Sequence, residues 1–252
     1  MRTAYHIVIP ARMASERLPG KPLLDIAGKP LIEHVYRRAL EASSDSVVIA
    51  TDDERIRRVA EAFGAAVVMT SERHRSGSDR IAECAALLGW DDDTLVVNLQ
   101  GDEPLMPAAC LDQVAALLAA DTRCQMASLY WPLQRAGEIR DPNCVKVVTA
   151  ADGAALLFSR SVIPFPRHWR DLQSALAAGA RWFRHIGLYA YRLHALQAFS
   201  RHQPTPLECA EKLEQLRVLE TGGRIAMAQA CCFIPAGVDT EKDLERVRNL
   251  IR

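Results

Sequence analysis

Short runs of β-branched residues alternate with longer amphipathic segments through the first half of this chain, and no other feature limits its fold as strongly. The runs predict strands at 5–10, 46–50, 66–70 and 94–99, and the segments after them predict helices at 30–42, 54–63, 78–88 and 107–120. A helix between two strands returns the chain to the starting edge of the sheet, so the two strands run parallel. The pattern therefore predicts an α/β fold on a mostly parallel sheet.

The alternation stops after residue 120. Strand-like runs at 126–132, 145–149 and 155–158 follow one another with few helical residues between them, which favours antiparallel additions to the sheet. Further along we expect a helix at 208–220, a strand at 225–230 and a last helix at 240–250. Thr240 and Asp243 have the spacing of a capping box at the start of that last helix.

Composition limits the class of protein and its partners. A chain of 252 residues with 49% hydrophobic content is long enough for one domain with a large core, and we expect a single domain over 1–252. Its 31 basic and 31 acidic residues cancel, so no overall positive field attracts nucleic acid or an anionic membrane. No stretch approaches the ~20 apolar residues of a membrane span, and no signal-like run is found, so we expect a cytoplasmic protein.

The seven cysteines are scattered, without a CxxC pair and without a histidine at zinc-finger spacing. Buried, reduced thiols are the expected state. The adjacent pair Cys231-Cys232 leaves redox activity as an alternative at that position.

A basic loop follows the first expected strand. Arg12, Arg17 and Lys21 fall within ten residues there, and Gly20 restricts the path of the loop. The carboxyl end of a strand is where open α/β sheets bind ligands, and guanidinium, ammonium and backbone N–H groups together suit phosphates. The segment has neither the GxGxxG nor the GxxxxGK[ST] pattern, which disfavours a dinucleotide fold and a Walker-type NTPase. The loop predicts a local polyphosphate site, with a solvated basic loop as the alternative.

Two carboxylates are candidates for holding Mg²⁺. Asp102 follows the strand at 94–99, and Mg²⁺ prefers one or two carboxylates together with phosphate oxygens and water. Asp239 lies just before the last helix and would share an ion with Asp102 if that turn folds back over the sheet edge. Ordinary turn and helix-dipole preferences are the alternative explanation for both.

A set of short motifs in fixed order extends nearly from end to end of the chain. They lie at 9–12, 17–22, 50–52, 76–80, 100–104, 145–148, 158–160, 184–189, 213–217 and 237–240. In these motifs the chain resembles the 3-deoxy-manno-octulosonate (KDO) cytidylyltransferase family. The resemblance implies transfer of CMP from CTP to KDO, with release of pyrophosphate, for lipopolysaccharide assembly. It also implies a homodimer and a mixed, mostly parallel, Rossmann-like sheet of about seven strands with helices on both faces, in which 120–200 contributes sugar-binding and dimerisation elements.

The resemblance also assigns roles to individual residues. Those implied for the nucleotide are Arg12, Ser15, Lys21, Ser76, Gly77, Arg80 and Gln100, of which Arg12 and Lys21, together with Asp102, are expected to be catalytic. Those implied for the sugar acid are Arg160, His185, Tyr189, Glu214 and Gln215. Asp102 and Asp239 are the implied Mg²⁺ ligands.

The first motif departs from the family pattern at Glu16, where the family has threonine. A carboxylate beside a triphosphate would repel it, so we expect Glu16 to point outward or to pair with a cation such as Arg17. This makes Arg12 and Lys21 the stronger candidate phosphate ligands. Two other functions stay open: a cytidylyltransferase for another acid, such as sialic acid or a phosphonate, and a non-catalytic nucleotide-binding relative. The presence of both candidate metal carboxylates weighs against the second.

Overall fold

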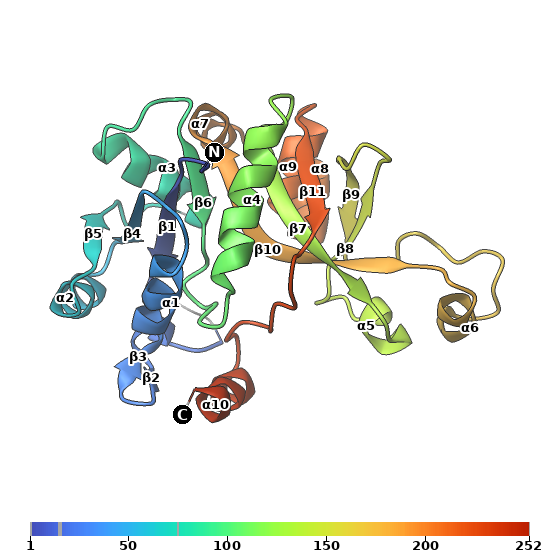
Figure 1. The fold of residues 1–252 in the computed structure, drawn as a ribbon, viewed down its shortest axis with the longest axis horizontal. Coiled ribbons are helices and arrows are strands. Elements are labelled where there is room, and N and C mark those ends of the chain that lie inside the picture. Colours follow the sequence, from blue (N-terminus) through green and yellow to red (C-terminus); the bar gives the residue numbers. More distant parts are fainter. Residues whose placement is uncertain (1, 15–16, 75, 252) are drawn as a thin grey trace.

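A single mixed sheet organises the chain, as seen in a computed structural model that describes residues 2–14, 17–74 and 76–251 (Figure 1). Its nine strands are β1 (His6–Ala11), β4 (Ser46–Thr51), β5 (Ala66–Met69), β6 (Leu95–Asn98), β7 (Met126–Leu133), β8 (Lys146–Thr149), β9 (Ala155–Ser159), β10 (Trp182–Arg192) and β11 (Ile225–Gln229). A small hairpin is formed by β2 (Asp25–Ile26) and β3 (Lys29–Pro30), after the 3₁₀ turn η1 (Lys21–Leu23). The helices are α1 (Leu31–Leu40), α2 (Glu54–Ala62), α3 (Gly77–Leu87), α4 (Ala108–Ala120), α5 (Ala136–Arg140), α6 (Leu172–Ala177), α7 (Leu193–Arg201), α8 (Pro206–Glu211), α9 (Gln215–Glu220) and α10 (Glu241–Leu250).

The strand order places the ligand edge of the sheet. Seven strands follow the order β11-β7-β10-β6-β1-β4-β5, and β8 and β9 extend from β10. β1 is parallel to both β4 and β6, whereas β10 is antiparallel to β6 and β7. The chain leaves β1 toward β4 and later returns to β6 on the other side, so the connections diverge between β1 and β6. Ligands of open α/β sheets bind at such a switch point, beyond the carboxyl ends of the strands.

Helices cover both faces of the sheet because successive side chains of each strand point to opposite sides. In β1, Ile7 and Ile9 pack with α1, α2 and α4, whereas Val8 packs with α3, α7 and α9. All three β1 side chains are completely buried. The predicted fold class, a mixed and mostly parallel sheet with helices on both faces, is confirmed.

The C-terminal helix reinforces the region around the basic loop. Thr240 and Asp243 form the predicted capping box at the start of α10. Leu244 and Val247 of this helix pack against Leu18 and Ile26, so the helix covers the hairpin that follows the loop (Figure 1). None of the described helices is long and apolar enough to span a bilayer.

Two expectations about the second half of the chain were wrong. The expected helix at 208–220 is divided into α8 and α9, because Lys212 adopts a left-handed backbone conformation with φ of 53°. The longest strand, β10, was missed. It pairs with β6 and β7, and it begins at Trp182, next to the arm that carries α6 (Figure 1).

Candidate active site

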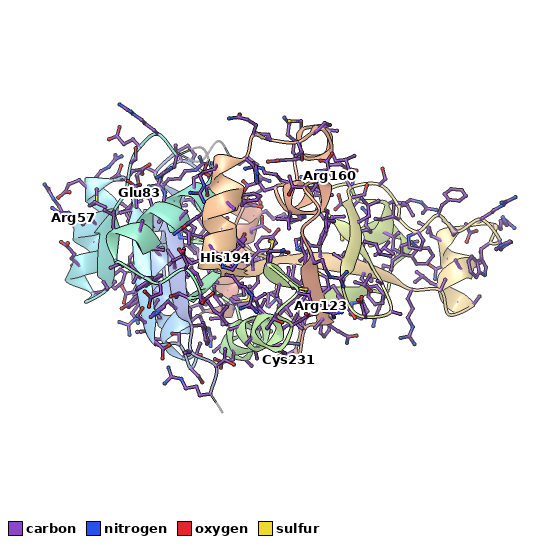
Figure 2. All side chains as sticks on the ribbon, turned by 90° about the horizontal axis from the view of Figure 1, so that it is seen from above. Arg57, Glu83, Arg123, Arg160, His194 and Cys231 are labelled. Carbon is purple, nitrogen blue, oxygen red and sulfur yellow. The ribbon has the colours of Figure 1, made fainter. Side chains whose placement is uncertain are left out.

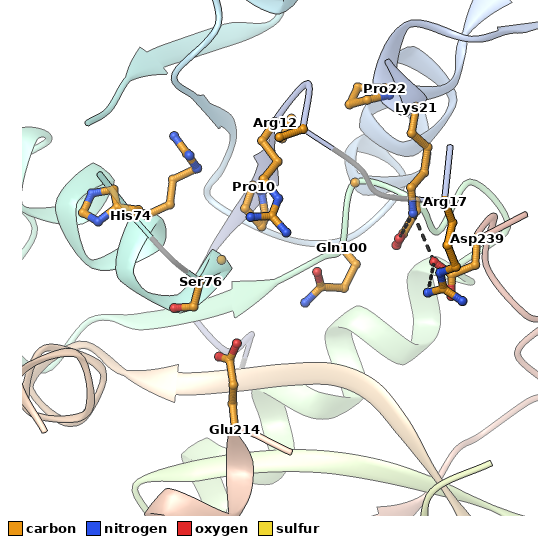
Figure 3. Close-up of a pocket in the computed structure, with 16 residues that line it drawn as sticks. Pro10, Arg12, Arg17, Lys21, Pro22, His74, Ser76, Gln100, Glu214 and Asp239 are labelled. Atoms are coloured by element: carbon orange, nitrogen blue, oxygen red, sulfur yellow. Dashed lines mark hydrogen bonds and ion pairs between the residues drawn. The ribbon is translucent and has the colours of Figure 1, made fainter. Parts of the chain in front are cut away.

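A cleft of about 480 Å³ lies at the carboxyl ends of β1 and β6 (Figure 3). Its described walls come from the basic loop, from the start of α3 and from the segment after β6, and they are completed by Glu214 and Asp239. The candidate nucleotide residues Arg12, Lys21, Ser76, Gly77, Arg80 and Gln100 all line it, as do both candidate metal carboxylates. The fold therefore brings these motif residues, which are far apart in the sequence, together at one edge of the sheet.

Lys21 lies between the two carboxylates. Its Nζ donates to Asp102 Oδ2 at 2.7 Å and to Asp239 Oδ1 at 3.1 Å. The Lys21 side chain is only 13% exposed, and burial alone would lower its pKa, but the two carboxylates more than offset burial and raise the pKa above its usual value. Arg17 approaches Asp239 from the solvent side at 3.2 Å (Figure 3). Lys21 therefore supplies a cation between the two carboxylates of the cleft.

Two glycines allow these carboxylates to meet. A Cβ at Gly237 would lie 2.9 Å from the backbone oxygen of Asp102, and the next residue, Val238, donates its N–H to that same oxygen at 2.8 Å. A Cβ at Gly101 would lie 2.9 Å from the backbone oxygen of Pro10. Such distances are too short for any side chain, so glycine permits the close approach of the three segments. The turn before α10 does fold back over the sheet edge, as the metal hypothesis required.

Glu103, next to Asp102, is held against Gly237 behind the carboxylate pair. Burial, followed by the charge of Asp102, raises the pKa of Glu103 to about 8. Glu103 is therefore mostly protonated at neutral pH and adds little negative charge to the pair.

The amino end of α3 forms the opposite wall of the cleft. Ser76 caps this helix by accepting the N–H of Asp79 at 3.1 Å, and Ser76 and Gly77 line the cleft where the helix begins. An anion is stabilised at such a position by the helix dipole and by the unpaired donors. Arg80 is buried and donates to Thr70 and Asp52, which anchors the helix to the ends of β5 and β4. In the ligand-free protein its guanidinium is therefore a structural support of the wall.

A second cavity of about 300 Å³ adjoins the first and shares Gly77, Gln100 and Glu214 with it. Tyr189 and Gln215, both candidates for the sugar acid, line it as well. Partial desolvation raises the pKa of Glu214, while a hydrogen bond from Ser78 at 3.2 Å opposes that rise. The two cavities therefore meet at one carboxyl group and one amide.

His185 supports the second cavity from behind. Its Nε2 lies 2.9 Å from Ser128 Oγ, and the Ser128 hydroxyl also faces the carbonyls of Ile186 and Leu188. The Ser128 hydroxyl donates its one proton to one of these carbonyls, so it must accept a hydrogen bond from Nε2–H of His185. Nδ1 of the ring is then unprotonated and accepts a hydrogen bond from the Gln215 amide at 3.5 Å. Burial, followed by the charge of Arg184, lowers the pKa of His185 to about 3. The ring is neutral at physiological pH and orients Gln215.

This buried histidine predicts acid sensitivity of the fold. The unfolded chain takes up a proton at His185 near pH 6.5, whereas the folded chain does so only near pH 3, so stability falls as the pH drops between these values. Between pH 7 and pH 5 this residue alone should cost about 2 kcal/mol of the free energy of unfolding. Urea denaturation at both pH values, on the native protein and on His185→Asn, measures the difference. Equal losses in the two proteins would show that His185 ionises normally in the fold.

Arg160 is not among the described residues that line either cavity, although it bonds to Glu211, the neighbour of Lys212 in the wall of the second cavity. Its Nε donates to the carbonyl of Glu211 at 2.7 Å, and another guanidinium nitrogen donates to the carbonyl of Pro142 at 2.9 Å. The backbone around it is held by the buried Lys146, whose Nζ donates to the carbonyl of Arg160 at 2.6 Å. The role of Arg160 in binding the sugar acid stays a prediction. Ser15 and Glu16 lie outside the described residues.

Several residues that line the cavities carry no signal of their own in the sequence. His74 lines the first cavity, and its Nε2 forms a hydrogen bond of 2.5 Å with Glu83 Oε2. Asn98, at the end of β6, lines the second, and its buried Oδ1 has no hydrogen-bond partner among the described residues. A buried amide oxygen without a partner is costly, which suits a site where a ligand donates to it. In the sequence Asn98 cannot be distinguished from an ordinary strand residue, because nothing in the sequence indicates that β10 lies beside it.

Comparisons with known proteins agree with this geometry. A family model described as "Cytidylyltransferase" matches residues 6–225, and the chain belongs to that family. It is 52% identical to the 3-deoxy-manno-octulosonate cytidylyltransferase of Thioalkalivibrio sulfidiphilus, over 99% of each chain. It is 50% identical to that of Pseudomonas fluorescens, over 100% of this chain and 99% of the relative. The family resemblance drawn from the motifs is confirmed.

Solved structures extend the agreement to three dimensions. CMP:2-keto-3-deoxy-manno-octonic acid synthetase, solved in complex with CTP, matches with a TM-score of 0.89 and 42% identity, over 98% of this chain and 97% of that one. A 4-diphosphocytidyl-2C-methyl-D-erythritol synthase matches with a TM-score of 0.64 at 15% identity and shares the fold alone.

Proposed function

We propose that this chain transfers CMP from CTP to the anomeric hydroxyl of KDO and releases pyrophosphate. The observation that carries the proposal is the pair of cavities that meet at Gln100 and Glu214. The first joins cations to a carboxylate pair, as a nucleoside triphosphate requires, and the second offers hydroxyl, amide and carboxyl groups, as a polyhydroxylated sugar acid requires. The relatives and the CTP-bound structure support the same reaction. Its product would serve lipopolysaccharide assembly.

The arrangement favours catalysis by positioning. Arg12 and the amino end of α3 bind the triphosphate from opposite sides, which leaves the α-phosphorus facing the wall shared by the two cavities. In the second cavity Tyr189 and Gln215 hold the sugar, and Glu214 accepts a hydrogen bond from one of its hydroxyls at the shared wall. The hydroxyl oxygen then attacks the α-phosphorus in line with the departing pyrophosphate, whose bond to that phosphorus breaks, and the hydroxyl proton is released to water. Lys21 neutralises charge on the phosphates once it leaves its carboxylate partners.

Mg²⁺ fits the donors of the first cavity. Asp102 and Asp239 direct an oxygen each at one cation, the Lys21 ammonium, so the protein already gathers two carboxylates around a positive charge. Two carboxylates completed by phosphate oxygens and water are a preferred Mg²⁺ environment. When bound, the ion would supply charge neutralisation and polarisation of phosphate oxygens. Asp102 and Asp239 are the residues that would hold it.

Pyrophosphate release tests the proposed function directly. The purified chain is incubated with CTP and MgCl₂, and with KDO, an amino-KDO analogue, N-acetylneuraminate or no acceptor. We expect release with KDO well above release with N-acetylneuraminate or without acceptor. Preference for another acid would replace the proposed acceptor and leave the cytidylyltransferase class intact. No release with any acceptor would contradict enzymatic activity altogether.

The proposal includes a homodimer in the cytoplasm. Seven free thiols suit a reducing compartment. Large apolar side chains are exposed within 120–200, among them Leu156 at 59% and Phe165 at 79%, and these side chains are available to a subunit contact.

Light scattering should therefore give about twice the chain mass of 27.9 kDa. Phe165→Asp should weaken the dimer, because it places a charge in the expected contact. Leu250→Asp, at a residue 62% exposed on α10, should have no effect. A native protein with the mass of one chain would contradict the dimer.

A further inference from the structure

Three thiols converge at a place that the transfer reaction does not use. Cys110 lies in the first turn of α4, and Cys231 and Cys232 follow β11, so two distant parts of the chain supply the group. Figure 2 shows Cys231 beside the helix α4. Among the described residues, this is the group of three that could hold a metal ion. The expectation that these cysteines are buried was wrong for Cys231, which is exposed, while Cys110 is fully buried.

The thiols form a nearly equilateral triangle. Cys110 Sγ lies 3.7 Å from Cys231 Sγ and 3.6 Å from Cys232 Sγ, and the last two sulfurs are 3.9 Å apart. Thiolates bound tetrahedrally to zinc at about 2.3 Å are roughly 3.8 Å from one another. The three sulfurs thus have the spacing of three zinc ligands. Cys231 is exposed, so solvent has access to the group and can supply a fourth ligand.

The backbone that presents the thiols is held in place. Gln113, one turn after Cys110 on α4, accepts the N–H of Cys231 at 2.8 Å and donates to the carbonyl of Gln229 at 2.8 Å. Ala230 donates its N–H to the carbonyl of Tyr130 at 2.9 Å, which continues the pairing beyond β11. Little ordering of the chain is therefore needed when a metal binds, and preorganisation of this kind favours affinity.

We propose that Cys110, Cys231 and Cys232 form a binding site for a thiophilic divalent cation with the chemistry of Zn²⁺, completed by water or an external ligand. Each coordinating thiol gives up its proton to solvent, so binding of one ion releases up to three protons. The bound ion would join α4 to the segment that leads from β11 to Asp239. The site is separate from the proposed CMP transfer and does not depend on it.

Metal binding fits the cluster better than a disulfide does. Burial, followed by the neighbouring thiols, raises the pKa of Cys110, and burial raises the pKa of Cys232. A disulfide would join only two of the three sulfurs, which lie 3.6–3.9 Å from one another, whereas one ion accepts all three. A bound cation, in contrast, lowers the thiol pKa itself and stabilises all three thiolates together.

Cobalt and zinc titrations test the proposal on the full-length, reduced, metal-free protein. Co²⁺ is added with excess MgCl₂ present, so that carboxylate sites are occupied. We expect thiolate-to-cobalt charge-transfer bands that saturate at one equivalent per chain and disappear when ZnCl₂ is added. Carboxylates cannot give these bands, so binding at Asp102 and Asp239 is distinguished from binding at the thiols.

Serine variants locate the site. Cys231→Ser replaces an exposed side chain and should fold normally, and we expect it to weaken Zn²⁺ binding at least tenfold in competition with a chromophoric chelator. Cys209→Ser is the matched control, because Cys209 is also exposed and lies outside the cluster. ZnCl₂ should raise the thermal midpoint of the native protein and of Cys209→Ser, and should shift that of Cys231→Ser much less.

Three results would overturn the proposal. One is the absence of stoichiometric charge-transfer bands in the native protein. Another is unchanged Zn²⁺ affinity in Cys231→Ser. The third concerns the mass of the reduced protein after it is mixed with ZnCl₂ in air. A loss of two hydrogen masses, without bound zinc, would show that two of the thiols form a disulfide.

Discussion

Replacing Asp102 with Asn is expected to lower turnover by about two to three orders of magnitude while the fold stays intact. Asn has nearly the same shape but no charge, so the Lys21 ammonium loses its 2.7 Å ion pair and keeps Asp239 as its described carboxylate partner. The proposed Mg²⁺ site would lose half of its protein charge, which weakens any ion held there together with phosphate oxygens. The effect should fall mainly on kcat, because the neutralisation is needed most as charge moves onto pyrophosphate.

The intact fold follows from the surroundings of Asp102. Its side chain is 30% exposed and its described ion pair is with Lys21, and a partly solvated pair contributes about 1 kcal/mol or less. Circular dichroism and the thermal midpoint should therefore be close to those of the native protein. Asp93→Asn, in the exposed turn before β6, is the control for loss of a negative charge. Turnover of Asp102→Asn within tenfold of the native value would remove Asp102 from the chemistry.

The first half of the fold was predictable because each element there is encoded locally. Strands β1 and β6 have buried, mostly apolar runs at 7–9 and 95–98, and amphipathic helices such as α1 follow at regular intervals. Strand-end positions then imply that Arg12 and Asp102 share one edge of the sheet. The close approach of Asp239 was not predictable from its own segment, since it depends on contact between Gly237 and the backbone of Asp102.

The second half was harder because its structure depends on distant contacts. β10 contains large polar side chains such as Arg184 and His185, which are not typical of a buried strand. The partner of His185, Ser128 on β7, is distant in the sequence, so the strand could not be predicted from its own residues. The break between α8 and α9 is equally non-local. Arg217 on α9 reaches back to pair with the buried Glu208 on α8, and Lys212 adopts its positive φ between them. A continuous helix over 208–220 would place Glu214 differently. The wrong helix prediction therefore affects a residue that the two cavities share.

Replacing Lys21 with Met is expected to lower kcat/KM for CTP by about a hundredfold, since a charged hydrogen bond to phosphate contributes about 1.5–3 kcal/mol. In the ligand-free protein this ammonium is bound to Asp102 and Asp239, so it must leave them to reach a triphosphate. Met fills the same volume without charge, and the two carboxylates then face each other without their shared cation. Lys21→Arg keeps the charge and should recover part of the loss.

The same variant has a second effect that does not depend on activity. If the ammonium occupies the place of a metal ion between the carboxylates, its removal should strengthen Mg²⁺ binding to the ligand-free protein. MgCl₂ should then raise the thermal midpoint of Lys21→Met more than that of the native protein, by mass action on the folded state. Lys21→Met combined with Asp239→Asn should lose this extra response, because one of the two ligands is gone. Native-like kcat/KM for CTP in Lys21→Met would place the triphosphate away from this lysine, and an unchanged response to MgCl₂ would show that Lys21 and the ion do not compete for the same carboxylates.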